Sequence, residues 1–364
     1  MRFERGLVVG SLLLDFPIDG VFPFHSIDND SYIYGARFSP RLKYDANPEF
    51  RLVVSPAFQM GSANGLTATG LRYFRDQPDT RLALGHFNPG NQDIRLDIPE
   101  AYLQFRPSNN VQIRIGRNYW DNTLQRRMRD WSFEGFTDGN IGDAPISLGA
   151  GGDVRLTKKW QRAIPARVDL SASGAVGARK EALGLVQGIV TFLPVESAPD
   201  SVTVIGGSLG YSHYPQGALA ELLPGVSANA AGDGISGSLY LQQGFGRSFD
   251  LRVGYGAFIP TSMGSETNAV PLGERRGLTV TADYQQRYWG VHATYGKVWR
   301  NDLENRPGTQ TEDLFGVSGR FMLLGEKNRN INLSLGTTFA KSADQFRFGV
   351  FAGLEIALQD IHLR

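Results

Sequence analysis

Cysteine is absent from this chain of 364 residues, so disulfide bonds and thiolate metal sites are excluded. Long apolar runs are absent too. A helix needs about 20 consecutive apolar residues to cross a bilayer, and no stretch comes near that length, which excludes a helical membrane protein. Charge of one sign is also missing, because 37 Lys and Arg oppose 36 Asp and Glu for a formal net charge of +1. This balance gives no reason to expect nucleic acid as a partner.

Spaced metal ligands and catalytic motifs are scarce as well. The five histidines show no spacing typical of metal ligands, so neither a metal nor another cofactor is expected; they are His25, His86, His213, His292 and His362. One segment, 206–210, reads Gly-Gly-Ser-Leu-Gly and matches the G-x-S-x-G motif of hydrolases. That motif needs a strand, a sharp turn and a helix, whereas this copy lies within a strand pattern. We therefore expect no enzyme, and Ser208 or Ser212 near His213 would be the only candidates for a nucleophile beside a base.

What the chain does have is strict alternation of apolar and polar residues. From 249 to 260, one face carries Leu251, Val253, Tyr255, Ala257 and Ile259, and the other carries Arg252, Gly254 and Gly256. Period-two alternation predicts β-strands. Eighteen such segments can be read: 3–14, 32–44, 50–61, 66–76, 81–87, 94–106, 111–117, 146–157, 166–177, 183–193, 201–213, 234–244, 249–260, 276–286, 289–298, 314–324, 331–341 and 346–358. The segment 3–14 is read as a first strand and not as a signal peptide, because Asp15-Phe16-Pro17 follows its short apolar run.

The connections alternate in length. Short ones follow the even-numbered strands, at 45–49, 77–80, 107–110, 158–165, 194–200, 245–248, 287–288 and 325–330. All the long ones follow odd-numbered strands, at 15–31, 118–145, 214–233, 261–275 and 299–313. An up-and-down barrel in the outer membrane has this arrangement, with tight periplasmic turns and longer external loops. An even strand count also brings both termini to the periplasmic side.

The apolar face of the strands predicts lipid as its surroundings. A soluble β-sandwich also alternates, but its polar face is typically rich in Lys, Glu and Thr, whereas Gly, Ser, Thr, Gln and Arg dominate here. A closed barrel pairs every backbone amide and carbonyl, as lipid requires. Aromatic residues stand near strand ends, where interfacial girdles belong; they are Tyr32, Tyr44, Phe50, Trp289 and Trp299. The fold expected for residues 1–364 is a single all-β domain, a transmembrane antiparallel up-and-down β-barrel of about 18 strands, within a range of 16–18.

The segments 101–107 and 111–117 resemble a hairpin of the general porin superfamily of Gram-negative outer membranes. The first ends in Arg106-Pro107 and the second in Gly116-Arg117. The resemblance implies a multi-pass barrel in the cell outer membrane, in contact with outer-membrane lipid and lipopolysaccharide, and a homotrimer. One departure is the C-terminus, Ile361-His362-Leu363-Arg364, because barrels of this kind usually end on an aromatic residue.

Charged residues at inward positions are the candidates for the pore lining. Basic residues predominate there, since acids are limited to Asp153, Asp169, Asp283 and Glu355. The long connection 118–145 is the candidate constriction, because the resemblance implies that a long loop folds into the pore. Together the pore-lining and constriction candidates are Arg37, Arg41, Arg114, Arg117, Arg126, Arg127, Arg129, Glu134, Asp138, Arg155, Arg252, Arg320 and Arg347. The alternative for the inward charges is that they lie near the rims, hydrated and paired with one another. The alternative for residues 118–145 is an external loop whose charges are solvated.

These features predict a porin, a passive diffusion channel for small hydrophilic solutes or ions with a weak preference for anions. A dedicated channel for saccharides or another specific solute is an alternative, for which stacked aromatic residues in the lumen would be expected. Tyr102, Tyr240 and Phe258 are inward but scattered. A barrel hydrolase and a structural barrel filled by a partner are further alternatives.

Overall fold

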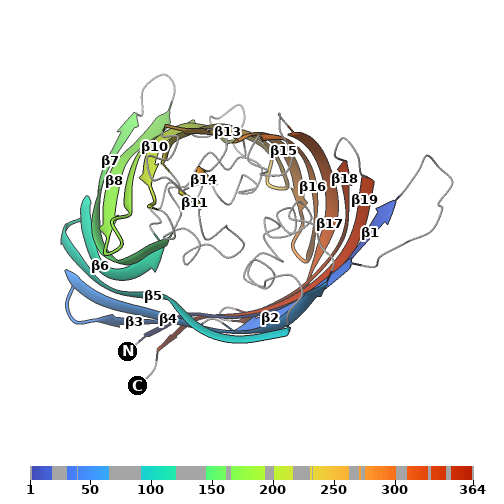
Figure 1. Ribbon diagram of the computed structural model, residues 1–364, viewed down its shortest axis with the longest axis horizontal. Helices are drawn as coiled ribbons and strands as arrows, with labels where there is room; N and C mark the ends of the chain where they lie inside the picture. Colours follow the sequence, from blue (N-terminus) through green and yellow to red (C-terminus); the bar gives the residue numbers. More distant parts are fainter. Residues whose placement is uncertain are drawn as a thin grey trace.

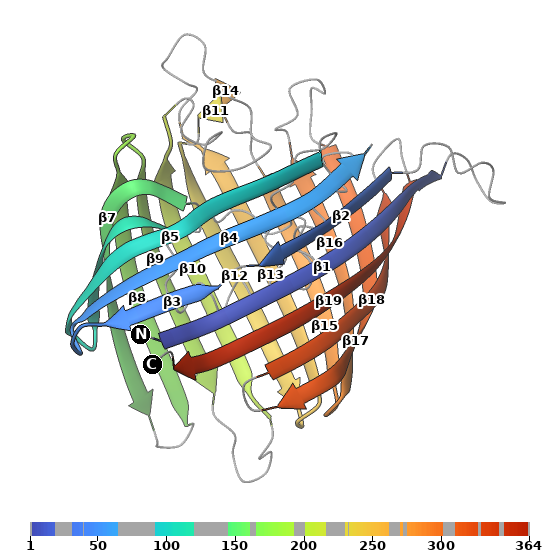
Figure 2. The ribbon, with the colours of Figure 1, turned by 90° about the horizontal axis from the view of Figure 1, so that it is seen from below.

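The computed structural model describes residues 2–18, 31–38, 40–64, 92–119, 145–160, 165–192, 201–215, 230–231, 233–261, 270–271, 275–300, 310–326, 329–341 and 346–362. They form a ring of long tilted strands around a central space (Figure 1). Seen from the side, the strands run obliquely, and both termini lie toward one rim (Figure 2). The regular elements in the described part of the chain are all β-strands.

The strands are β1 (Arg2–Ile18), β2 (Ser31–Phe38), β3 (Arg41–Asp45), β4 (Phe50–Asn64), β5 (Gln92–Ser108), β6 (Val111–Tyr119), β7 (Pro145–Trp160), β8 (Ala166–Gly177), β9 (Ala182–Phe192), β10 (Thr203–His213), β11 (Ala230–Ala231), β12 (Gly234–Phe245), β13 (Phe249–Pro260), β14 (Val270–Pro271), β15 (Arg275–Gln285), β16 (Trp289–Arg300), β17 (Gln310–Glu326), β18 (Arg329–Lys341) and β19 (Phe346–His362). All belong to one 17-stranded sheet except β11 and β14, which pair with each other. Thus β1, predicted from its alternation, is confirmed as a strand.

Each strand of the large sheet pairs antiparallel with its neighbours along the chain, as an up-and-down order requires. The last strand, β19, returns to the first, and the pairing runs from Arg2 opposite His362 to Ile18 opposite Phe346. Every strand of the described sheet therefore has a partner on both sides, and the ring of pairings closes. Closure satisfies the backbone groups that lipid would leave unpaired.

The number of strands differs from the expected eighteen. Both β2 and β3 pair with β1 and with β4, so they are two parts of one strand interrupted at residues 39–40. If β2 and β3 are counted as one strand, the 17 strands of the described sheet become 16. The count of 18 is therefore not confirmed. The expected strands 66–76 and 81–87 lie outside the described residues, and β4 pairs directly with β5. That residues 1–364 form a single domain stays a prediction.

Tight turns join the strands at the rim that holds the termini. Between β3 and β4, the Asn47 side chain accepts hydrogen bonds from the backbone amides of Glu49 (2.9 Å) and Phe50 (2.8 Å). Between β12 and β13, Gly246 adopts a φ of 66°, which favours glycine. The connections after β1, β4, β6, β10, β13 and β16 leave from the opposite rim and are longer. In up-and-down barrels of the outer membrane, tight turns are periplasmic and longer loops external, and the sequence predicts this orientation for the two rims.

The two faces of the sheet differ as the alternation predicts. On β13, Tyr255 and Ile259 are exposed outward, while Gly254 and Gly256 are buried. On β15, Thr279 and Thr281 are buried between outward neighbours. The outer surface is apolar, with Leu209, Val186 and Leu239 each more than half exposed. The assignment of apolar residues to the outside is therefore confirmed for these strands.

Exposed aromatic side chains mark the turn rim on the outside. Three aromatic pairs flank turns or lie beside one: Phe50 with Phe105 (4.7 Å between ring centroids), Phe245 with Phe249 (5.8 Å) and Tyr284 with Trp289 (5.5 Å). Their level corresponds to an interfacial girdle, where amphipathic rings lie beside lipid headgroups. The expected girdle positions Tyr44, Phe50 and Trp289 are exposed at this rim.

Candidate pore lining

The inner face of the ring is lined by small and polar side chains. Buried members from strands around the described sheet include Ser55, Gln104, Ser171, Gln187, Ser236, Thr279, Thr294, Asn332 and Ser334. These residues alternate with outward apolar ones, so the strand period directs them inward. Charged side chains interrupt this polar surface in two regions, one on β12–β16 and one on β3–β8.

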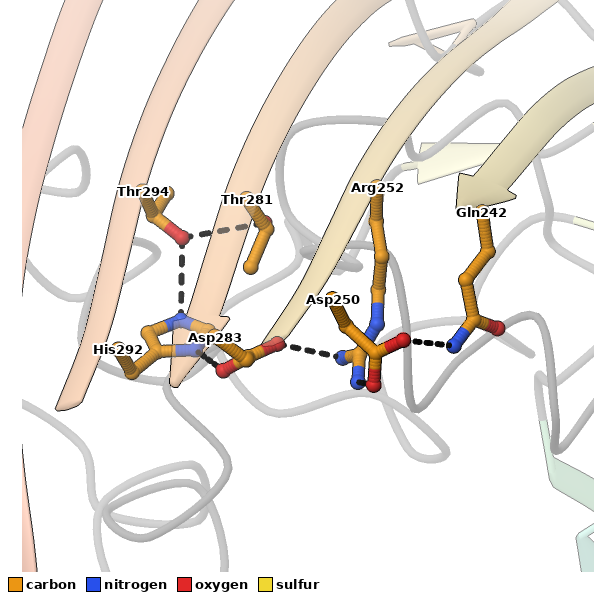
Figure 3. Close-up of polar contacts among 7 residues, drawn as sticks. All are labelled: Gln242, Asp250, Arg252, Thr281, Asp283, His292 and Thr294. Atoms are coloured by element: carbon orange, nitrogen blue, oxygen red, sulfur yellow. Dashed lines mark hydrogen bonds and ion pairs between the residues drawn. The ribbon is translucent and has the colours of Figure 1, made fainter. Parts of the chain in front are cut away.

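The first region is a row of side chains across four neighbouring strands, β12, β13, β15 and β16 (Figure 3). Its centre is Arg252, whose guanidinium binds Asp283 at 2.9 Å and lies 3.6 Å from Asp250. On one side, Gln242 donates a hydrogen bond to Asp250 at 3.1 Å. On the other side, His292 Nδ1 meets the second carboxylate oxygen of Asp283 at 2.5 Å.

The row continues upward through hydroxyl groups. His292 Nε2 lies 3.0 Å from Thr294 Oγ1, which lies 3.1 Å from Thr281 Oγ1. The register explains the contacts, because Asp283 stands opposite His292 and Thr281 stands opposite Thr294. The inner wall here is a continuous hydrogen-bonded band in which two carboxylates share one guanidinium. We name the seven residues drawn in Figure 3 the Arg252 row.

The second region lies across β3, β5, β6 and β7 and is dominated by arginine. Arg41 donates a hydrogen bond to the Tyr102 hydroxyl at 2.9 Å, and the Arg114 guanidinium lies 5.4 Å from the centre of the same ring. Asp153 lies within electrostatic range of the charges of Arg114, Arg106 and Arg155. One acid therefore faces several cations, and the local charge is positive.

On β7 and β8 a compact ion pair continues this region. Asp169 is fully buried and receives hydrogen bonds from Thr157 (2.6 Å) and Arg167 (2.8 Å), and a second Arg167 nitrogen lies 2.8 Å from its other oxygen. A bidentate contact of this kind fixes a guanidinium in one orientation. We call Arg41, Arg51, Arg106, Arg114, Asp153, Arg155, Arg167 and Asp169 the arginine wall.

Basic groups outnumber acidic ones among the inward strand positions whose side chains are described. The cations are Arg41, Lys43, Arg51, Arg114, Arg155, Lys159, Arg167, Arg252 and Arg320, and the acids are Asp45, Asp153, Asp169, Asp250 and Asp283. Arg320 is opposite Gly290 and Ser334, near the turn rim. The excess is concentrated on the arginine wall, whereas the Arg252 row contains two carboxylates and one arginine.

Apart from Arg117, the predicted pore-lining residues divide into three groups. Arg41, Arg114, Arg155, Arg252 and Arg320 occupy inward positions. Arg37 and Arg347 are described only by their backbone, opposite Gln59 and Ala340. The loop candidates Arg126, Arg127, Arg129, Glu134 and Asp138 lie outside the described residues.

Arg117 is a correction. It stands opposite Ala101, which alternates with the buried Tyr102, so the register assigns Arg117 to the outer face. Next to it, Gly116 has a φ of 133°, and the register of β6 with β7 shifts between Gly116 and Asn118. Glycine is required there because a Cβ atom would collide with the Ala101 carbonyl oxygen. Counting in twos from the inward Arg114 also assigns Arg117 to the outer face. The bulge itself lies in the pairing of β6 with β7, which alternation along one strand does not reveal.

The sequence predicts only part of the Arg252 row. Alternation places Arg252 and Asp283 on the inward face, whereas Gln242, Asp250 and His292 are not among the predicted pore-lining residues. Their positions on inward faces could have been read from the same alternation. Their contact, however, depends on the register between strands, which one sequence does not contain.

The structure places the serine and histidine candidates on β10. Ser208 lies in the middle of β10 and pairs with the Ser238 hydroxyl at 2.7 Å, so the G-x-S-x-G segment forms no strand-to-helix turn. His213 binds Asp233 at 2.6 Å at the end of the same strand. Among the residues that the structure describes, no three His, Asp or Glu side chains gather as metal ligands. The described residues also include no helix with the length and apolar character to span a membrane.

Comparison with known proteins gives the fold. No family model matches this chain, and no curated protein matches it. Among solved structures it is similar to OpdQ of Pseudomonas aeruginosa, with 11% identity, a TM-score of 0.52, and coverage of 98% of this chain and 97% of that one. Other similar structures are OccK7 (OpdD) of Pseudomonas aeruginosa (10% identity, 98% of each chain, TM-score 0.49) and OmpT, an outer membrane protein of Vibrio cholerae (12% identity, 96% and 97%, TM-score 0.49). The likeness to OpdQ, together with the ring of strands, shows a porin-type outer-membrane β-barrel fold.

Proposed function

We propose that this barrel is a passive diffusion channel for small hydrophilic solutes and ions in the outer membrane of a Gram-negative-type bacterium. The observation that carries the proposal is the closed ring of strands with an apolar outer face and a charged inner face. Lipid fits the outer face and water fits the inner one, so a polar pathway through the membrane follows. The channel carries out no covalent chemistry; its wall only sets which solutes enter.

Weak anion preference is part of the proposal. It is supported by the excess of cations at inward positions and by the Asp153 carboxylate facing three arginines. Fixed positive charge on a pore wall concentrates anions near it. That the 118–145 connection narrows the pore with Arg126, Arg127 and Arg129 stays a prediction, and so does a homotrimer.

A saccharide channel is less well supported by the lumen. Such a channel needs aromatic faces open to the solute, yet the inward Tyr102, Tyr240 and Phe258 are only 3%, 7% and 0% exposed. The Tyr240 ring lies against Gly206, where a Cβ atom would collide with it, and the Phe258 ring covers Gly234 in the same way. These rings fill space at the wall and present little surface for a sugar to stack on.

Conductance in a planar bilayer tests the proposal. The refolded protein should open stepwise ohmic channels in KCl, and heat-denatured protein from the same preparation should give none. Ser238→Arg adds a long side chain at an inward position of β12 and should lower the single-channel conductance. Folded, heat-modifiable protein that stays silent in the bilayer would contradict a diffusion channel and favour the plugged barrel or the barrel hydrolase.

A further inference from the structure

The outer face of β15–β18 carries an unusual charged cluster near the rim of the long connections. Lys297 on β16 stands opposite Asp313 on β17, and its ammonium lies 3.5 Å from that carboxylate. Asp313 in turn stands opposite Lys341 at the end of β18. The Tyr295 hydroxyl donates a hydrogen bond to Asp313 at 2.6 Å, so this carboxylate contacts two side chains and has Lys341 opposite it on the next strand.

A third cation extends the cluster toward β15. Arg276 is exposed and stands opposite Trp299, and the Lys297 ammonium lies 5.8 Å from the centre of the Trp299 ring. We call Arg276, Lys297 and Lys341 the outer basic cluster. At this rim, Asp313 is the only acid among the outward positions of β15–β18 whose side chains are described, so the net charge of the site is positive.

The level of the cluster follows from the length of β16. Trp289 and Trp299 lie on the same outward face of this strand, ten residues apart. At roughly 3.4 Å per residue and a tilt near 40°, that separation spans about 26 Å along the barrel axis. This matches the apolar band of about 25 Å expected between two aromatic girdles. Trp299 therefore marks the external interface, and Lys297 can extend its ammonium group to the same level.

An aromatic row lies one step below the cluster. Phe315 and Phe339 are neighbours at 6.3 Å between ring centroids, and Phe339 and Phe348 at 5.0 Å. Tyr295 stands opposite Phe315 and continues the row onto β16. The cations thus lie nearer the rim of the long connections, and the aromatic rings lie nearer the middle of the barrel. A lipid in the external leaflet has the same order, with its charged headgroup outside its apolar acyl chains.

We propose that the outer basic cluster binds the phosphorylated headgroup of a lipid in the external leaflet, with the acyl chains against the aromatic row. The inference rests on the membrane location given under the proposed function. Phosphate oxygens accept charge-assisted hydrogen bonds from lysine and arginine, and several cations at one site bind a phosphorylated headgroup far better than one. Two cations also lie over aromatic rings at the turn rim, Lys158 over Trp160 (5.3 Å) and Arg287 over Tyr288 (5.0 Å). These two cations are on separate strands and turns, so they form no cluster of the same kind.

Native mass spectrometry of the full-length protein in detergent, titrated with diphosphoryl lipid A, tests the proposal. The parent protein should retain one bound lipid, and Lys297→Gln with Lys341→Gln should weaken retention by more than tenfold, at about fivefold for each cation removed. Asp313→Asn removes the competing carboxylate and should strengthen it. The matched control is Lys158→Gln with Arg287→Gln, which removes two cations over aromatic rings at the turn rim and should change nothing.

Equal weakening in the cluster variant and the control variant would overturn the site, because the binding would then be unspecific attraction. Weaker retention in Asp313→Asn would overturn it as well. Equal retention of phosphatidylethanolamine, whose single phosphate is offset by its own ammonium group, would overturn the site, because the cations would then not select the negative charge of the headgroup. Displacement of the lipid by inorganic phosphate at millimolar concentration would contradict the role of the aromatic row. A parent protein that retains the lipid but conducts no ions would refute only the channel.

Discussion

At the scale of single residues, Arg252 is the side chain on which the Arg252 row depends. It lies between Asp250 and Asp283, and its own side chain is only 18% exposed. Two carboxylates on a partly dehydrated wall repel each other, and a charge that loses its partner there is costly. The neighbours cannot replace it, since Gln242 is neutral and His292 contacts only the far oxygen of Asp283.

Replacing Arg252 with methionine should therefore destabilise the barrel by about 1–3 kcal/mol, the cost of leaving a buried polar partner unsatisfied. Methionine keeps much of the length and removes the charge and the donors. Unfolding in urea with detergent micelles measures the free energy. The same variant should shift the reversal potential toward cations, because the wall loses one positive charge.

A double-mutant cycle with Asp283→Asn separates the pair from its surroundings. The asparagine removes the negative charge that Arg252 neutralises, so the double variant should lose less stability than the sum of the single variants. Strict additivity would mean that the 2.9 Å contact contributes nothing measurable.

At the scale of the element, the two faces of one strand should respond oppositely to the same substitution. On β12, Leu239 is 67% exposed on the outer face and Ser238 points inward beside Ser208. Leu239→Arg should destabilise the barrel by about 2–4 kcal/mol, because an arginine near the membrane midplane loses its hydration. Ser238→Arg should cost less and should instead lower the conductance.

Unfolding free energies of both variants in lipid vesicles provide the measurement. Leu239→Met is the control for the lost leucine shape, since it keeps the position apolar. A similar cost for Leu239→Arg and Ser238→Arg would contradict the assignment of faces on β12.

The sequence predicted the elements better than their contacts, and the reason is physical. Alternation is local, so strands such as 234–244 and 249–260 could be read with ends close to those of β12 and β13. The interruption between β2 and β3, the bulge of β6 against β7 at Gly116 and the direct pairing of β4 with β5 arise between strands. Which inward charges meet, as in the arginine wall, depends on that register and therefore could not be predicted from one chain.

At the scale of the whole molecule, charge is distributed unequally around the ring. The arginine wall lies on β3–β8, whereas the Arg252 row on β12–β16 balances its arginine with two carboxylates. A solute in the lumen therefore meets one basic side and one side where the acids outnumber the arginine. A formal net charge of +1 for the chain hides this asymmetry, because other charges lie outside the lumen.

The last prediction concerns the selectivity that this asymmetry produces. The parent channel should show a modest preference for chloride in a KCl gradient, and the preference should fade as ionic strength rises. The field of the wall extends about 10 Å at 0.1 M salt and much less at 1 M, so screening removes it from the pore. Arg41→Gln with Arg114→Gln and Arg155→Gln should weaken the preference further, because the arginine wall then loses three of its cations.

Two further variants locate the charge that matters. Arg276→Gln with Lys297→Gln and Lys341→Gln removes three cations from the outer face and should leave the reversal potential unchanged, since the barrel wall separates them from the lumen. Arg126→Gln with Arg127→Gln and Arg129→Gln tests the contribution of the 118–145 connection. A larger change of the reversal potential in this variant than in the wall variant would mean that this connection, and not the arginine wall, sets the selectivity. Cation preference in the parent protein would refute the charge argument itself, because an excess of fixed positive charge along a pore should attract anions and repel cations.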